Sequence, residues 1–223
     1  MLLAAIALAT APMAGLAIAA PVAAATAKPL ERLVALLLPE ESLITLAARA
    51  FDAGLDREVA NNAELRAIHA RQPGFKAYVA SRLRPALATM LKKELPGLRR
   101  EIRAIVAAEL KPREIEEALA FFASPTGAKL RTQVYATMGD NPNQSPEAMQ
   151  AAAISAVMKQ MKAADYPALI AFGASSAASK MNIVNPKIAA ASRAWSDRLV
   201  AKNSKKMRAL AAAAVRHYKA GGK

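Results

Sequence analysis

Residues 112–130, PREIEEALAFFASPTGAKL, hold the best-defined local pattern of the chain. Pro112 and the glutamates after it predict a helix start, because proline fits the first turn and carboxylates are favourable at the positive end of the helix dipole. Ser124 and Pro125 predict the cap and the first position of a second helix. Gly127 has no side chain, which lets the preceding helix approach closely. The segment therefore predicts a corner between two helices rather than an active site.

Prolines recur along the whole chain, mostly just before segments in which apolar residues are spaced by three and four positions. This is the usual place of proline in the first turn of a helix. Strand signals are sparse, and no Asn-Gly or Asp-Gly hairpin turn occurs. The sequence therefore predicts an all-α fold without a sheet, a multi-helix bundle of short helices punctuated by proline. Pro85 predicts a kink or a division in the fourth helix. The expected helices cover residues 29–37, 40–59, 62–71, 74–94, 97–109, 112–123, 125–138, 146–163, 166–180 and 187–218.

The composition limits the chemistry of the chain. It has 223 residues and no cysteine, which excludes disulfide scaffolds, thiolate metal sites and cysteine nucleophiles. Apolar residues make up 54%, too many for a disordered chain, although alanine adds helix propensity more than core volume. We expect residues 28–223 to form one all-helical domain. The turn-rich stretch 139–145 separates two halves of it, residues 28–138 and 146–223.

Residues 1–27 contain no charged side chain and form an apolar run that ends in small residues. This is typical of a secretory signal peptide, and residues 25–27, Ala-Thr-Ala, offer the small side chains that a signal peptidase needs before Lys28. The alternative is an uncleaved membrane anchor, since a span needs about 20 apolar residues. Pro12, Gly15 and the many alanines favour cleavage over retention in lipid. We expect a mature protein that is periplasmic or secreted.

A fainter copy of the helix corner lies about fifty residues further along, at residues 168–181. It has an apolar helix end with Phe172, a turn of small residues rich in serine, and Lys180 followed by an apolar residue. These features have the same order as the helix end, turn and lysine of residues 118–130. A degenerate two-fold internal repeat explains the likeness. Chance similarity in a chain rich in alanine and serine is the alternative.

The first corner resembles the F-x-S-P-x-G-x-K signature of an exported bacterial family that is catalogued as domain of unknown function twenty-fifty-nine. The matching residues are Phe122, Ser124, Pro125, Gly127 and Lys129. The likeness covers about residues 95–140 and extends to 190 through the second copy. What the resemblance implies is an all-helical, periplasmic protein of a family with no established activity. It carries over no catalytic residue.

The positive charge of the chain is concentrated in two segments. Against 17 Asp and Glu the chain has 31 Lys and Arg, a formal net charge of +14. Residues 82–103 hold seven basic and two acidic side chains, and residues 187–223 hold ten basic side chains against Asp197 alone. Such asymmetry favours an anionic partner, while the alternative is a merely solvated surface. The residues that we expect on this basic surface include Arg99, Arg100, Arg103, Lys202, Lys205, Lys206 and Arg208.

No group of residues forms a clear catalytic or metal-binding pattern. His69 and His217 lack a second His, Asp or Glu three or four positions away, so we expect no metal site. The adjacent glutamates at 40–41 and 116–117 stand at helix starts, where the helix dipole already accounts for them. No glycine loop for a phosphate and no nucleophile elbow is present in the sequence. We therefore expect neither a cofactor nor an enzyme.

Together these features predict an exported, non-enzymatic helical protein with a binding or envelope-associated role. The alternative is a peripheral protein that binds an anionic membrane surface through its basic segments, residues 82–103 and 187–223. Another envelope protein is a further candidate partner. Nucleic acid is not an expected partner, because the last helix has no aromatics among its basic residues apart from Trp195 and Tyr218, and export would separate the protein from cytoplasmic nucleic acid.

Overall fold

The computed structural model describes residues 27–140 and 146–221, and this part of the chain forms helices and connecting turns without a strand. The predicted all-α bundle is therefore confirmed. The predicted signal peptide, apart from Ala27, and residues 141–145 lie outside the described residues. The elements are α1 (Ala27–Leu37), α2 (Glu40–Asn61), α3 (Ala63–Arg71), α4 (Phe75–Glu109), α5 (Pro112–Ala123), α6 (Pro125–Asp140), α7 (Pro146–Gln160), the 3-10 turn η1 (Ala163–Asp165), α8 (Tyr166–Gly173) and α9 (Ser176–Lys219).

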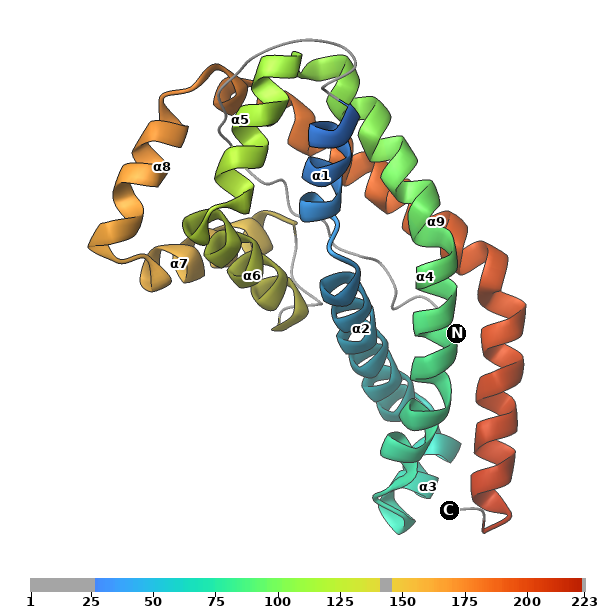
Figure 1. Cartoon of the computed structure of the whole chain (residues 1–223). Coiled ribbons are helices and arrows are strands. Elements are labelled where there is room, and N and C mark those ends of the chain that lie inside the picture. Colours follow the sequence, from blue (N-terminus) through green and yellow to red (C-terminus); the bar gives the residue numbers. More distant parts are fainter. Residues whose placement is uncertain (1–26, 141–145, 222–223) are drawn as a thin grey trace.

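Two long helices form the axis of the molecule (Figure 1). α4 and α9 pack side by side and run in opposite directions. α2 packs against α4, and α3 lies at the narrow end of the molecule, next to the start of α4 and the end of α9. At the other end α1 packs against α5, and α6 and α7 pack together beside them. The molecule is therefore narrow where α2, α3, α4 and α9 meet and broad where α5 to α8 join them.

The hydrophobic core follows the face of α4 that α2 and α9 cover. Each large apolar side chain removed from water stabilises the fold by about 1.5–3 kcal/mol. The core is continuous from α1 to the last turns of α9. The buried residues of α4 recur at helical spacing and include Leu83, Leu87, Leu91, Leu95, Leu98, Ile102 and Val106. Those of α9 include Met181, Val184, Trp195, Leu199 and Met207.

Prolines end fewer helices than the sequence predicts. The separate helices expected at 74–94 and 97–109 are one helix, α4, which continues through Pro85 and Pro96. α9 continues through Pro186 in the same way. A proline inside a helix removes one backbone hydrogen bond and costs about 3 kcal/mol. Apolar residues are buried on both sides of each proline, and their burial offsets that cost.

Other boundaries agree more closely with the expected ones. Pro112, Pro125 and Pro146 each occupy the first position of a helix, α5, α6 and α7 respectively. The helix expected at 166–180 is divided, because α8 ends at Gly173 and α9 begins at Ser176, after two intervening residues. Among the described residues, no helix is both long enough and apolar enough to cross a membrane.

Candidate functional site

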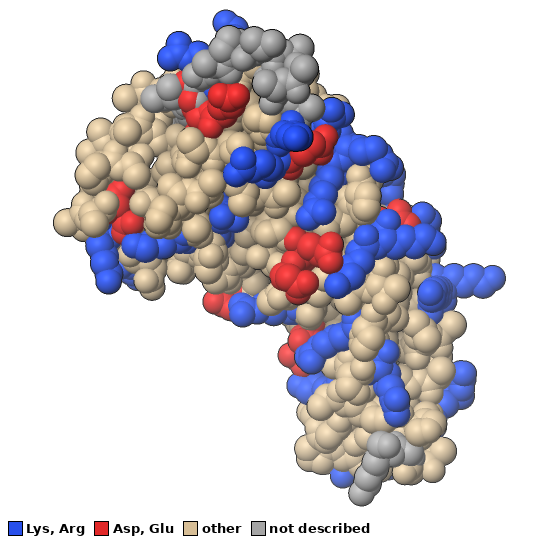
Figure 2. Space-filling model, viewed as in Figure 1, with Lys and Arg blue, Asp and Glu red and all other residues tan. Residues whose placement is uncertain are grey.

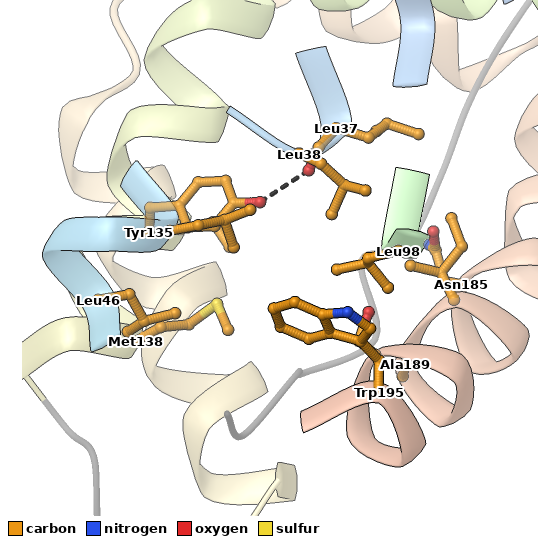
Figure 3. Close-up of a pocket in the computed structure, with 13 residues that line it drawn as sticks. Leu37, Leu38, Leu46, Leu98, Tyr135, Met138, Asn185, Ala189 and Trp195 are labelled. Atoms are coloured by element: carbon orange, nitrogen blue, oxygen red, sulfur yellow. Dashed lines mark hydrogen bonds between the residues drawn. The ribbon is translucent and has the colours of Figure 1, made fainter. Parts of the chain in front are cut away.

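An apolar pocket lies where α1, α2, α4, α6 and α9 meet (Figure 3). It holds about 730 Å³ of space, including its open mouth. Tyr135 and Met138 of α6 lie on one side, Trp195 of α9 lies on the other, and Leu37 and Leu38 form the wall above them. The remaining lining residues are Leu43, Leu46, Leu98, Val134, Asn185, Ile188, Ala189 and Ser192. A concave, mostly apolar lining with a few polar groups is typical of a site for a small molecule.

The wall formed by the end of α1 is fixed by polar side chains from other helices. The last carbonyls of a helix have no partner inside that helix. Here the Tyr135 hydroxyl donates to the Leu37 carbonyl at 2.7 Å, and the Arg99 guanidinium donates to the Leu38 carbonyl at 2.9 Å. Burial raises the pKa of Tyr135 far above its ordinary value, so its hydroxyl stays protonated and able to donate. These two hydrogen bonds fix the position of the connection between α1 and α2, which forms one wall of the pocket.

Asn185 is the polar residue of the pocket that lacks a complete set of partners. Its side chain is buried, with 5% of the residue exposed. Its Nδ2 has no hydrogen-bond partner among the described residues. A buried donor without an acceptor costs about 1–3 kcal/mol. The wall of the pocket therefore contains one N–H group without an acceptor, and this nitrogen has less than 1 Å² of surface open to solvent.

The sequence does not predict this pocket, because the lining residues come from five helices that are spread along the chain. One signal for it is present in the sequence. Asn185 and Ser192 fall on the apolar stripe of α9, between Val184 and Trp195, and both are buried. A polar residue on an otherwise apolar stripe marks a place where the core is not fully packed by apolar atoms. The predicted start of the last helix at residue 187 left Asn185 outside it.

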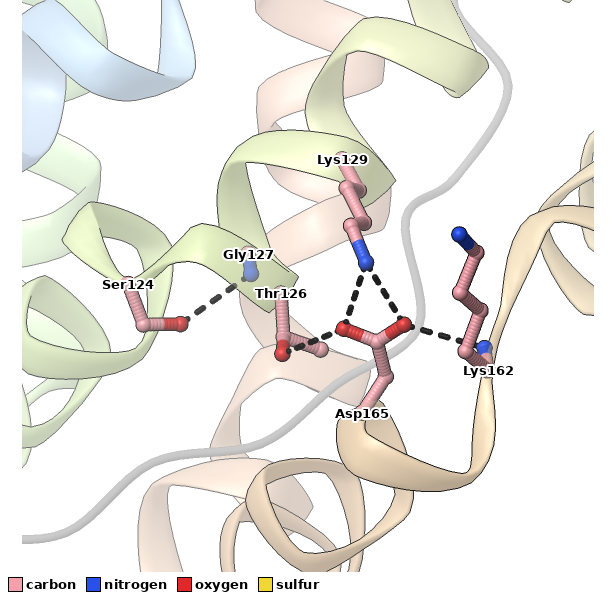
Figure 4. Close-up of polar contacts among 6 residues, drawn as sticks. All are labelled: Ser124, Thr126, Gly127, Lys129, Lys162 and Asp165. Atoms are coloured by element: carbon pink, nitrogen blue, oxygen red, sulfur yellow. Dashed lines mark hydrogen bonds and ion pairs between the residues drawn. The ribbon is translucent and has the colours of Figure 1, made fainter.

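The signature residues form the corner between α5 and α6 (Figure 4). The Ser124 Oγ accepts a hydrogen bond from the Gly127 backbone N–H at 3.1 Å, which is a cap of the kind serine supplies at a helix start. A Cβ atom added at Gly127 would lie 2.1 Å from the Phe121 carbonyl oxygen and 2.8 Å from the Phe122 Cα. The backbone of α5 thus leaves no room for any side chain at Gly127.

Lys129 fastens this corner to the turn before α8. Its Nζ contacts both carboxylate oxygens of Asp165, at 2.9 and 2.8 Å. Asp165 also accepts hydrogen bonds from the Thr126 hydroxyl and the Lys162 backbone N–H, both at 3.0 Å. The Lys129 hydrogen bond, followed by that from Lys162, lowers the pKa of Asp165 to about 2. All of these groups are used in holding helices together, which leaves no free reactive group at the corner.

The two similar segments of the sequence meet at their phenylalanines. The Phe172 ring stacks on the Phe121 ring with centroids 3.5 Å apart, and it meets the Phe122 ring edge-on at 5.7 Å. Phe172 stands at the end of α8, where the chain turns into α9, so both segments are helix corners. Among the described residues Lys180 has no ion-pair partner that corresponds to Asp165. It lies near Glu109, whose pKa is lowered mainly by the hydrogen bond from Lys187 and also by the charge of Lys180.

The two basic segments lie side by side because α4 and α9 pack together, and Figure 2 shows acidic side chains among the basic ones there. Arg103 pairs with Glu31 of α1, and Lys202 pairs with Glu94 of α4, each at 2.6 Å. Arg99 is half-buried beside the pocket. The residues of the predicted basic surface that are exposed without an ion-pair partner in the described ranges are Arg100, Lys205, Lys206 and Arg208.

Glu117 of α5 is a buried carboxylate outside the pocket. Its side chain is 7% exposed, and neither carboxylate oxygen has a hydrogen-bond partner in the described part of the chain. The Arg113 guanidinium lies 3.5 Å from it. Burial raises the pKa of Glu117 to about 7, and Arg113 opposes the shift. Glu117 therefore titrates near neutral pH.

Within residues 27–140 and 146–221, no group of three or more metal-ligating side chains is placed to hold a metal ion. Neither His69 nor His217 has a carboxylate partner, and His217 Nδ1 instead lies 2.7 Å from the Tyr78 hydroxyl. No known protein family, curated protein or solved structure matches this chain. No relative therefore suggests a function for the pocket, and only its geometry indicates one.

Proposed function

We propose that this protein is an exported, non-enzymatic binding protein that holds a small, mostly apolar molecule in the pocket beside Trp195. The observation that supports the proposal most directly is the unpaired Nδ2 of Asn185 in an otherwise apolar pocket. A ligand with an apolar body gains from the Leu, Met and Trp walls. An acceptor oxygen on that ligand gives Asn185 the hydrogen bond that it lacks.

The lining also defines what kind of ligand fits. No lining residue carries a charge, so a neutral acceptor such as a carbonyl or ether oxygen suits the pocket better than a carboxylate. The Tyr135 hydroxyl already donates a hydrogen bond to the Leu37 carbonyl. The lining contains no carboxylate, imidazole or amine that could act as a general base, which supports binding rather than catalysis.

Export and family membership belong to the same proposal. Export is supported by the apolar, uncharged residues 1–27, and membership in the family of unknown function is supported by the F-x-S-P-x-G-x-K pattern. Both stay predictions. The alternative, attachment to an anionic membrane through α4 and α9, is supported by the exposed cations Lys205, Lys206 and Arg208.

The pocket contains its own reporter, because Trp195 is the single tryptophan of the chain. We expect the neutral dye N-phenyl-1-naphthylamine to accept excitation energy from Trp195 and to bind saturably. Ala189→Phe fills the pocket and should abolish binding. Ala190→Phe is the matched control, since Ala190 is the next residue of α9 and is exposed. Equal dye binding by the two variants would refute the proposal.

A further inference from the structure

Exposed apolar side chains that do not line the pocket lie on two consecutive helices, α7 and α8, which η1 joins at a corner; this segment is called the hairpin. Large apolar side chains on it are exposed to water: Ile154 and Met158 on α7, and Tyr166 and Ile170 on α8. Their exposed fractions range from 42% to 68%. Each pair is spaced by four residues, so the two members share one face of their helix. No other described helix has two large exposed apolar side chains at this spacing.

The hairpin projects from the broad end of the molecule (Figure 1). Figure 2 shows this end as mostly uncharged, with a few acidic side chains and with basic side chains along its lower edge. Residues 146–173, from the start of α7 to the end of α8, contain two lysines, Lys159 and Lys162, and two acids, Glu147 and Asp165. Asp165 is buried and paired with Lys129. Between residues 148 and 173 the exposed charged side chains are therefore Lys159 and Lys162.

We propose that this hairpin docks on an anionic lipid surface, with Ile154, Met158 and Ile170 entering the headgroup layer. Lys159 and Lys162 then lie at the level of the lipid phosphates, where each lysine gains from the surface potential. Tyr166 has an aromatic body and a polar tip, which suits the boundary between acyl chains and water.

The same charges argue against a second copy of this chain as the occupant. In a two-fold contact the same patch of both subunits meets itself. Lys159 and Lys162 of both copies would then approach one another, and between residues 148 and 173 no acid is exposed to separate them. Like charges at close range oppose such an interface. An anionic bilayer has the complementary charge instead.

The test uses the full chain, which has no cysteine and so accepts a single fluorescent label. Ile170→Cys places an NBD fluorophore on α8, and Ala212→Cys places it on the basic face of α9, where Ala212 is exposed. The probe surface is vesicles of phosphatidylcholine with about one third phosphatidylglycerol, in about 0.1 M salt. We expect the emission at position 170 to shift to the blue and rise on these vesicles, and the emission at position 212 to stay unchanged.

Charge variants give an independent readout that needs no label. Lys159→Gln with Lys162→Gln should lower vesicle partitioning by about 30-fold, from about fivefold per lysine. The matched control, Lys205→Gln with Lys206→Gln, removes the same charge from α9 and should change partitioning much less. A response at position 212 without one at 170 would overturn the proposal in favour of α9. Dimerisation that Ile170→Ser abolishes, without any vesicle binding, would overturn it in favour of a second copy.

Discussion

Replacing Asn185 with leucine should make the protein more stable. The wild-type Nδ2 is buried without an acceptor, which costs about 1–3 kcal/mol. Leucine removes that donor and adds apolar surface next to Leu98 and Trp195, which line the same pocket. We expect the free energy of unfolding to rise by about 1–2 kcal/mol and the melting temperature by about 2–8 °C. Urea unfolding followed by circular dichroism measures the change.

Asn203→Leu is the matched control, because Asn203 also lies on α9 and its Nδ2 donates to the Leu199 carbonyl at 2.9 Å. Its replacement should bring no gain in stability. The Asn185→Leu variant should also still bind the neutral dye but lose about tenfold in its preference for ligands that carry an acceptor oxygen. A loss of stability in Asn185→Leu, or a gain equal to that of the control, would show that the Asn185 amide is already satisfied and would refute the reasoning.

Three further changes test other parts of the fold. Gly127→Ala should lower the free energy of unfolding by more than about 2 kcal/mol, since the new Cβ meets the α5 backbone. Gly97→Ala is the control and should raise it by about 0.5–1 kcal/mol, because the nearest atom to a Cβ there is 3.9 Å away on a side chain. Equal effects of the two changes in thermal melts would contradict this. The wild type should lose about 1–2 kcal/mol of stability as pH rises from 4.5 to about 7, because burial raises the folded-state pKa of Glu117. Glu117→Gln should abolish this loss. Parallel curves of stability against pH for the two proteins would rule out this role of Glu117. Asp165→Asn should abolish a separate loss as pH falls from about 4 to about 2, because Lys129 lowers the folded-state pKa of Asp165; an unchanged acid limb would count against the ion pair.

The sequence predicted the helix corner at the start of α6 well because its determinants are local. Ser124 caps the turn beside it, and position 127 requires glycine because a Cβ there would collide with the Phe121 carbonyl, only six residues earlier. The partner of Lys129 was not predictable, because Asp165 is 36 residues further along the chain. The stacking of Phe172 on Phe121 was not predictable either, because these residues are also far apart in the sequence.

The long helices were mispredicted because a local penalty was overruled by distant packing. Pro96 and Pro186 disfavour a helix interior by their own chemistry. Their helices continue because α4 and α9 bury apolar residues against each other on both sides of each proline. The pocket was hidden for a related reason, since the spacing of Tyr135 and Trp195 in the sequence gives no sign that their rings line one cavity.

The occupant of the pocket can be sought directly in the protein as cells make it. The protein and its two alanine variants should be purified, extracted with organic solvent and compared by mass spectrometry. The account predicts a small, neutral, mostly apolar compound that is retained by the wild type and by Ala190→Phe and is lost from Ala189→Phe. The same compounds at the same yields from all three proteins would contradict a binding site beside Trp195.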